Sequence, residues 1–117
     1  MSAGIYNDTL DQGATYQLVV VYKNDNGTPI NLTGFQAYMQ LREGYESTVA
    51  DLTLSTANGG ISINAPLGEI SITATATQTT ALTSDFYLYD LELVNGSTVT
   101  RLLQGQITVN SEVTRVP

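Results

Sequence analysis

The residues of this chain best placed to do chemistry are acidic side chains in its C-terminal third. Asp90 and Glu92 are two residues apart, and Asp85 lies close to them in sequence. Residues two apart in an extended strand share a face, and paired carboxylates can perform acid–base catalysis. The same pattern is typical of a solvent-facing strand whose charges prevent aggregation between sheets. We expect the second role for this acidic group.

The side chains that most catalytic and metal sites need are missing. Histidine and cysteine are both absent, which removes the usual base near neutral pH, the thiolate nucleophile and the commonest metal ligands. A serine or threonine nucleophile would lack its histidine partner, and no glycine-rich phosphate-binding motif occurs. Asn24–Gly27 resembles part of a calcium loop but lacks the later acidic ligands, so it predicts a hairpin turn. We expect a protein that is not an enzyme and binds no metal and no cofactor.

The charge balance of the chain is strongly acidic. Its 117 residues carry a formal net charge of −7, with Lys23, Arg42, Arg101 and Arg115 as the basic residues. Nucleic-acid binding needs clustered lysine and arginine, and anionic membranes attract basic surfaces. We therefore expect neither nucleic acid nor membrane among the partners. The first residues show no secretory leader pattern, so we expect synthesis in a cytoplasm without secretion.

The densest apolar alternation, between Asp85 and Asn110, predicts a β-hairpin. Two apolar runs, each with a single parity, flank an Asn-Gly-Ser break. We expect each run to face the core. The first run is Tyr87, Tyr89, Leu91 and Leu93, and the second is Val99, Leu103, Ile107 and Val109.

The register of this hairpin depends on the length of its loop. A three-residue loop, Asn95–Ser97, pairs Leu93 with Val99, whereas a two-residue Asn-Gly turn pairs Asp90 with Arg101. Burial of a large apolar side chain is worth roughly 1.5–3 kcal/mol, and an exposed ion pair about 0–1 kcal/mol. We therefore predict the three-residue loop, with Arg101 at a rim or behind a bulge.

Short alternating segments separated by glycine, asparagine or proline turns recur along the whole chain. Their spacing of roughly 8–12 residues predicts an all-β fold, an antiparallel immunoglobulin-like β-sandwich of seven or eight short strands. Residues 18–22 are apolar on both parities and predict a central strand covered on both sides. A short helical turn is expected near 77–82, where a threonine can cap it. We expect a single domain, residues 1–117.

Several aromatic and apolar residues are expected outside the core. Residues 1–12 are expected to form a docking arm or an edge strand, and residues 111–117 an extended tail. There are seven tyrosines and no tryptophan, so a sugar-stacking surface is an alternative to a tyrosine-rich protein interface. The expected interface residues are Ile5, Tyr6, Leu10, Tyr38, Tyr45, Val113 and Val116.

Two blocks of sequence carry a family resemblance. The first contains Gly13-x-Thr15-Tyr16 and the segments GTPINLTGF at 27–35 and AYMQLR at 37–42. The second contains Gly60-Ile61, Gly68-Glu69-Ile70, the segments TAL at 80–82 and YLYDLEL at 87–93, and Arg101–Gly105. Over roughly residues 11–115 the chain resembles a family of small tailed-bacteriophage structural domains, similar to the N-terminal domain of siphophage upper baseplate proteins. The segments at 27–34 and 87–91 are the most specific parts of this resemblance.

The resemblance implies a non-enzymatic part of a virion, made in the cytoplasm of a bacterial host. Such an immunoglobulin-like sandwich packs against copies of itself and against other tail or baseplate proteins, so a homo-oligomer is expected. The sequence contains no coiled-coil or receptor-binding extension after the single domain, which favours an adaptor or decoration role over host recognition. A cement protein that binds the major capsid protein of a phage head is one alternative. A carbohydrate-binding module is the alternative from another class.

Overall fold

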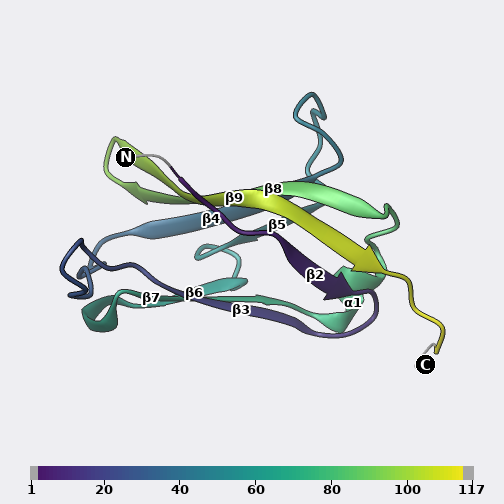
Figure 1. Cartoon of the computed structure of the whole chain (residues 1–117), viewed down its shortest axis with the longest axis horizontal. Coiled ribbons are helices and arrows are strands. Elements are labelled where there is room, and N and C mark those ends of the chain that lie inside the picture. The colour runs from purple at the N-terminus through teal and green to yellow at the C-terminus, as the bar shows by residue number, and fades with distance from the viewer. Residues whose placement is uncertain (1–2, 115–117) are drawn as a thin grey trace.

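The computed structural model describes residues 3–114 and shows two β-sheets packed as a sandwich (Figure 1). The expected all-β sandwich is therefore confirmed. Nearly all of the segments with period-two alternation form strands. In chain order the elements are β1 (Gly4–Ile5), β2 (Asp8–Asp11), β3 (Tyr16–Val21), β4 (Gln36–Arg42), β5 (Leu52–Ser55), β6 (Ile61–Asn64), a 3-10 turn (Ala65–Leu67), β7 (Glu69–Ala74), α1 (Ala76–Thr80), β8 (Phe86–Asn95) and β9 (Thr98–Asn110).

The strands are divided unequally between the two sheets. The larger sheet has the order β1-β9-β8-β4-β5, with β2 also paired to β9, and the smaller sheet has the order β3-β7-β6. Neighbouring strands are antiparallel except that β1 and β2 run parallel to β9. This distribution matches an immunoglobulin-like sandwich whose N-terminal strand lies on the larger sheet.

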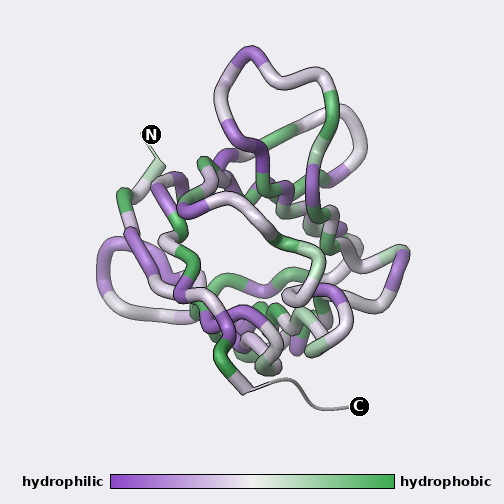
Figure 2. Tube along the Cα trace, turned by 90° about the vertical axis from the view of Figure 1, so that its right-hand side faces the viewer, coloured by the Kyte–Doolittle hydropathy of each residue, from purple (hydrophilic) through white to green (hydrophobic). Residues whose placement is uncertain are grey.

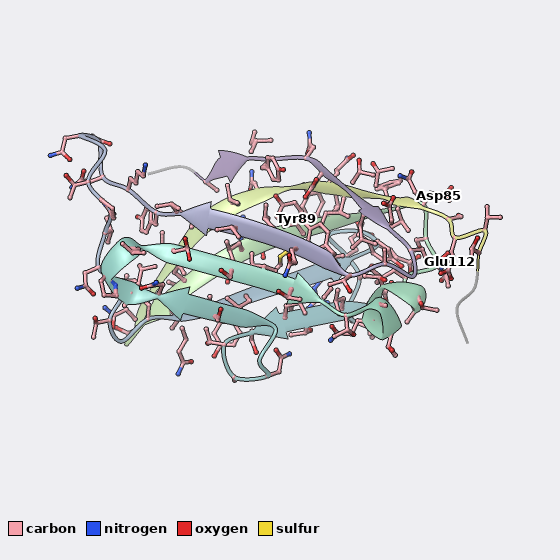
Figure 3. All side chains as sticks on the ribbon, turned by 90° about the horizontal axis from the view of Figure 1, so that it is seen from below. Asp85, Tyr89 and Glu112 are labelled. Carbon is pink, nitrogen blue, oxygen red and sulfur yellow. The ribbon has the colours of Figure 1, made fainter. Side chains whose placement is uncertain are left out.

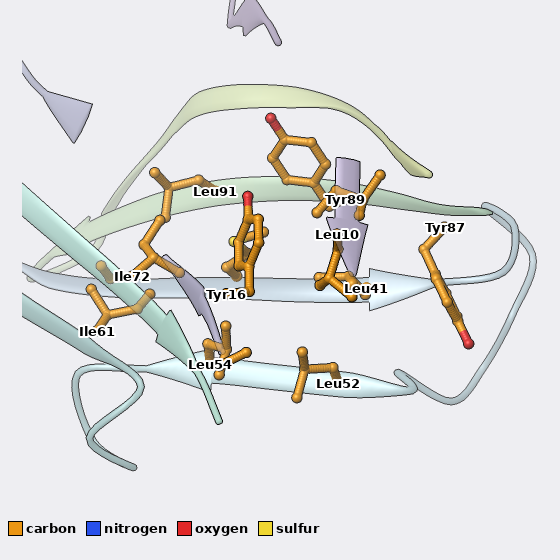
Figure 4. Packing of buried hydrophobic residues seen from close by; sticks show 14 of the residues in the cluster. Leu10, Tyr16, Leu41, Leu52, Leu54, Ile61, Ile72, Tyr87, Tyr89 and Leu91 are labelled. Atoms are coloured by element: carbon orange, nitrogen blue, oxygen red, sulfur yellow. The ribbon is translucent and has the colours of Figure 1, made fainter. Parts of the chain in front are cut away.

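Alternate side chains of both sheets fill the space between the layers. Figure 2 views the sandwich from one end, with the two layers facing each other. Leu54 of the larger sheet packs towards Ile72 and Ile61 of the smaller sheet (Figure 4). Each fully buried side chain of this size contributes roughly 1.5–3 kcal/mol. The first apolar run of the hairpin is buried throughout, as its parity predicts: Tyr87, Tyr89, Leu91 and Leu93.

The hairpin between β8 and β9 turns through two residues, Gly96 and Ser97, so the predicted three-residue loop is wrong. Leu93 pairs with Thr100 instead of Val99. Val99, which we expected in the core, lies on the outer face and is 58% exposed. The physical reason is the backbone of Gly96, whose φ of 63° favours glycine and moves the tight turn one residue along the chain.

A β-bulge in β9 changes which of its residues face the core. Glu92 pairs with Arg101, whereas Leu91 pairs with Leu103, so Leu102 is the extra residue of the bulge. Arg101 thereby stays on the solvent side, and the predicted position behind a bulge is confirmed. Beyond the bulge, the apolar residues of β9 regain the parity that faces the core.

β3 is an edge strand, so the prediction of a strand covered on both sides is wrong. It pairs with β7 alone among the described strands. Val19 and Val21 are exposed, at 59% and 43%, while Leu18 and Val20 face the other sheet and are partly buried. Its outer face is exposed because the sandwich has two layers in the described residues, and its edge is open because the chain before β3 crosses to β9 instead of folding back along β3.

The predicted helical turn near 77–82 is present as α1 but begins earlier, at Ala76. The hydroxyl of Thr75 caps it, and a glutamine three residues later completes the capping box. The fully buried hydroxyl of Thr79 donates a hydrogen bond to the carbonyl of Ala14 at 2.9 Å. The helix therefore fixes the segment that leads into β3.

Tyr87 makes a contact that is typical of immunoglobulin-like sandwiches. Its ring is buried at the start of β8, and its hydroxyl oxygen accepts a hydrogen bond from the backbone N–H of Ser84 at 3.1 Å. A tyrosine at this point that bonds to backbone a few residues upstream is the tyrosine corner of the fold. The contact fixes the connection between α1 and β8.

The N-terminal residues form edge strands of the larger sheet. Both β1 and β2 pair with β9, and Leu10 of β2 is fully buried. Gly105 of β9 permits this approach, because a Cβ atom there would lie 2.2 Å from the carbonyl oxygen of Tyr6. The amide oxygen of Asn7 accepts a further bond from the N–H of Gln106 at 3.0 Å. Of the two alternatives for residues 1–12, the structure shows edge strands in the described part of this range, residues 3–12.

The chain after β9 packs against the connection between β2 and β3. The backbone N–H of Glu112 donates to the side-chain oxygen of Gln12 at 3.1 Å, and the amide of Gln12 donates to two carbonyls at the end of α1. Gly13, with φ of 85°, leaves room for the carboxylate of Glu112. Glu112 and Asp85 lie at the same end of the sandwich (Figure 3). Residues 115–117 of the expected tail, including Val116, lie outside the described residues.

The burial of Leu10 predicts that the N-terminal segment stabilises the sandwich. We expect Leu10→Ala to lower the free energy of unfolding by about 2–5 kcal/mol, because it leaves a cavity in the core. Ile5→Ala, on the same segment but 76% exposed, is the matched control and should change it by less than about 0.5 kcal/mol. Urea denaturation of both variants measures the difference, and equal effects would contradict the observed docking of β2.

Candidate interaction surfaces

Asp90 and Glu92 lie together on the outer face of the larger sheet, beside one cation. The Nε atom of Arg101 is 3.4 Å from a carboxylate oxygen of Asp90 and 3.6 Å from one of Glu92. All three side chains are between one-third and just over one-half exposed, so the cluster contributes about 0–1 kcal/mol. The predicted solvent-facing charge pattern is what the structure shows at these positions.

A shallow polar groove lies on this outer face beneath the connection between β4 and β5, which rises away from the sandwich (Figure 1). Tyr45 of this connection borders the groove and is 92% exposed. Arg42 is held in place, since its guanidinium donates to the carbonyl of Ser47 at 2.9 Å and to the side chain of Gln40 at 2.8 Å. An aromatic ring therefore stands beside fixed donors and the carboxylate of Asp90, a combination that suits a polyhydroxylated ligand.

Tyr38 lies on the same outer face but not at this groove. It pairs with Glu92, which borders one end of the groove, but its own side chain is not part of the groove lining. The hydroxyl of Tyr38 also donates to the side chain of Gln36 at 2.8 Å. The two expected surface tyrosines of this sheet therefore do not form one stacking platform.

Two buried tyrosines tie the N-terminal segment to the sandwich. The hydroxyl of Tyr16 donates to a carboxylate oxygen of Asp8 at 2.6 Å, and that of Tyr89 donates to the carbonyl of Tyr6 at 2.6 Å. Burial, followed by the bond to Asp8, raises the pKa of Tyr16 far above its usual value. Burial, followed by the charge of Asp8, raises the pKa of Tyr89 to about 12.

Exposed apolar side chains gather where β1 lies beside the open edge of β3. Ile5, Val19 and Val21 are exposed, and they border one hollow together with Tyr6 and Leu103. We call these five residues the β1–β3 patch. In a chain with a net charge of −7, this contiguous apolar surface without a charged side chain is a candidate interaction surface.

The expected interface residues differ in their exposure to solvent. Ile5 and Tyr6 belong to the β1–β3 patch, whereas Leu10 is buried in the core and offers no surface. Val113 is 90% exposed after β9. Sequence reasoning missed Val19 and Val21, because their apolar run reads equally well as a covered central strand. The sequence has no charged residue between Gln12 and Tyr22, but a covered strand would share this property, so it could not have identified the two valines as exposed.

Other kinds of functional feature are not found in the part of the chain that the structure describes. No group of three or more acidic side chains between residues 3 and 114 is arranged to hold a metal ion. No helix in that range is long and apolar enough to cross a membrane. No model of a known protein family matches the sequence, and no curated protein matches it. The surfaces described above therefore carry the functional argument.

The buried tyrosines predict a loss of stability at alkaline pH. In the unfolded chain they ionise near pH 10, but the folded protein keeps them protonated to higher pH. Their stabilising contribution is complete below about pH 10, and the free energy of unfolding falls as the pH rises above that value. We expect a loss of about 1 kcal/mol per pH unit for each tyrosine. Urea denaturation between pH 9 and about pH 12 measures the slope.

The variant Tyr89→Phe isolates one of these groups. It loses the hydrogen bond to the carbonyl of Tyr6 and should be about 1 kcal/mol less stable at neutral pH. Above about pH 10 its stability should fall less steeply than that of the unaltered protein, because one ionisable group is gone. Parallel slopes for the two proteins would contradict the raised pKa of Tyr89.

Proposed function

We propose that this chain is a structural protein of a bacteriophage virion that works by packing against itself and other virion proteins. The sequence resemblance to siphophage baseplate domains supports this role. The sandwich supports it as well, because its exposed features are strand edges and an apolar patch, with shallow hollows on the surface. The proposal treats the chain as non-enzymatic.

The β1–β3 patch is the observation that carries this proposal. Its aliphatic side chains are exposed beside a strand edge whose backbone is open to pairing. Proteins that add strands to such edges gain affinity from backbone hydrogen bonds and specificity from alternate side chains. A surface of this kind fits an extended protein segment or another sheet better than a small molecule.

The tail or baseplate is the proposed location, and the phage head is the alternative. The resemblance favours the tail. A cement protein on the head would use the same kind of surface to bridge subunits of the major capsid protein. The two locations differ in copy number, since cement proteins cover a lattice and baseplate proteins occupy one end of the particle.

Mass spectrometry of purified virions, separated into head and tail fractions, tests this proposal. We expect the chain in the tail fraction, in far fewer copies than the major capsid protein. Recovery with the heads, in numbers comparable to the capsid subunits, would establish the cement role instead. Absence from both fractions would refute a structural role in the virion.

Carbohydrate binding is a second candidate, favoured by the position of Tyr45. Its exposed ring stands beside a groove with fixed side chains from Gln40 and Arg42 and the carboxylate of Asp90. Sugar recognition combines an aromatic surface with planar polar groups that accept and donate hydrogen bonds. The groove offers both.

A glycan-array screen with matched variants tests this second candidate. If the groove binds sugar, Tyr45→Ala should abolish the signal, because the stacking surface is lost. Tyr38→Ala removes a tyrosine from the same face that does not border the groove and should leave the signal unchanged. No binding by the unaltered protein, or equal loss in both variants, would eliminate this groove as a sugar site.

A further inference from the structure

The outer edge of β3 presents backbone groups that no described residue pairs with. The N–H of Tyr22 donates to the carbonyl of Gly68 at the start of β7 at 2.8 Å. Because hydrogen-bonded pairs alternate along antiparallel strands, residues of even number in β3 bond to β7. Gln17, Val19 and Val21 therefore turn their N–H and C=O groups away from the sheet. No hydrogen bond to these groups occurs within residues 3–114.

This edge differs from the other strand edges of the sandwich. β3 has six residues, whereas β1 has two, and β5 and β6 have four each. The edge formed by β2 carries Asp8 and Asp11. β3 has no charged residue, no proline and no bulge, which are the devices that normally prevent pairing between edges. It is the longest strand edge that remains open between residues 3 and 114.

We propose that β3 pairs antiparallel with β3 of a second copy of this chain, across a two-fold axis at Val19. Val19 is the midpoint of the three outward-facing residues, so this register places it opposite itself and places Gln17 opposite Val21. All three residues of each copy then pair, giving about six backbone hydrogen bonds. The two smaller sheets become one continuous sheet, and the interface is isologous.

The side chains that this register places opposite each other on the inner face are apolar. On the inner face, Leu18 of one copy lies opposite Val20 of the other, and both are partly exposed at the open side of the sandwich. Ile5 borders the same hollow from the larger sheet, so the second copy covers it as well. On the outer face, Val19 of each copy, which is 59% exposed in the single chain, contacts Val19 of the other copy across the two-fold axis.

Charge favours a second copy as the occupant of this edge. Between Gln12 and Asn24 the sequence has no acidic residue, so two copies of an otherwise acidic chain meet here without opposed carboxylates. The register brings Lys23, the single lysine of the chain, opposite Thr15 of the second copy.

This inference rests on the proposed role as an assembling structural protein and names the first partner and the surface. The two claims are tested separately. Virion fractionation shows where the chain is found, whereas the experiments below use the purified full-length chain alone. A monomeric chain that is present in virions would overturn only the self-pairing.

Analytical ultracentrifugation of two matched lysine variants tests the interface. Val19→Lys places two lysines directly opposite each other at the two-fold axis and should raise the dissociation constant about tenfold or more. Val49→Lys is the control, since Val49 lies on the connection between β4 and β5, borders neither hollow beside β3 and is 68% exposed. Both variants change the net charge equally. Val49→Lys should dimerise like the unaltered protein, and circular dichroism checks that both are folded.

Amide hydrogen exchange measured by NMR detects the backbone hydrogen bonds of the proposed strand pairing directly. The amides of Gln17, Val19 and Val21 should exchange fast in dilute protein and become protected as concentration rises from low micromolar to submillimolar. Leu18 and Val20, which bond to β7, should be protected at every concentration. This odd-to-even pattern distinguishes strand pairing from association through another surface.

Three outcomes would overturn the inference. The first is a monomer at submillimolar concentration. The second is protection of the odd-numbered β3 amides in the monomer, which would mean that a segment of the same chain covers the edge. The third is a dimer that Val19→Lys leaves intact, which would place the interface elsewhere. A monomer whose assembly into virions is lost in Val19→Lys alone would identify a different virion protein as the occupant.

Discussion

The pairing of the N-terminal segment with β9 determines which edges of this sandwich are closed. The segment precedes β3 in sequence and could lie along either sheet, but it crosses to the larger one. Burial of Leu10 and the bonds from Tyr16 and Tyr89 hold it there. Since a single short segment covers a single edge, β3 is left without a second partner. The open surface of the molecule is therefore a direct result of how its first residues dock.

Sequence alternation was a good guide to strands and a poor guide to their neighbours. The parity of Tyr87, Tyr89, Leu91 and Leu93 identified a buried face, because side chains in any strand alternate whatever the strand pairs with. The predicted hairpin register was wrong because the register depends on the position of the tight turn. The positive φ of Gly96 sets that position, and this outweighed the pairing of apolar side chains.

The open edge could not be predicted from composition for a related reason. An uncharged apolar run such as residues 18–22 is compatible both with a covered strand and with an edge strand that has one side unpaired. What separates the two is the path of a different segment, and that path depends on long-range features such as the space beside Gly105. The tyrosine corner is the opposite case, because Tyr87 at the start of a strand is a local signal in a sandwich of this type.

The parallel pairing of β1 and β2 with β9 also has a mechanical consequence. The described chain begins at one end of the long axis and finishes at the other, after strands that run in the same direction (Figure 1). A tensile force between the two ends would load the bonds of β1 and β2 to β9 together, in shear, instead of opening them one after another. The sandwich is thus arranged to resist extension along its length, and β5, at the far edge of the larger sheet, carries none of that load.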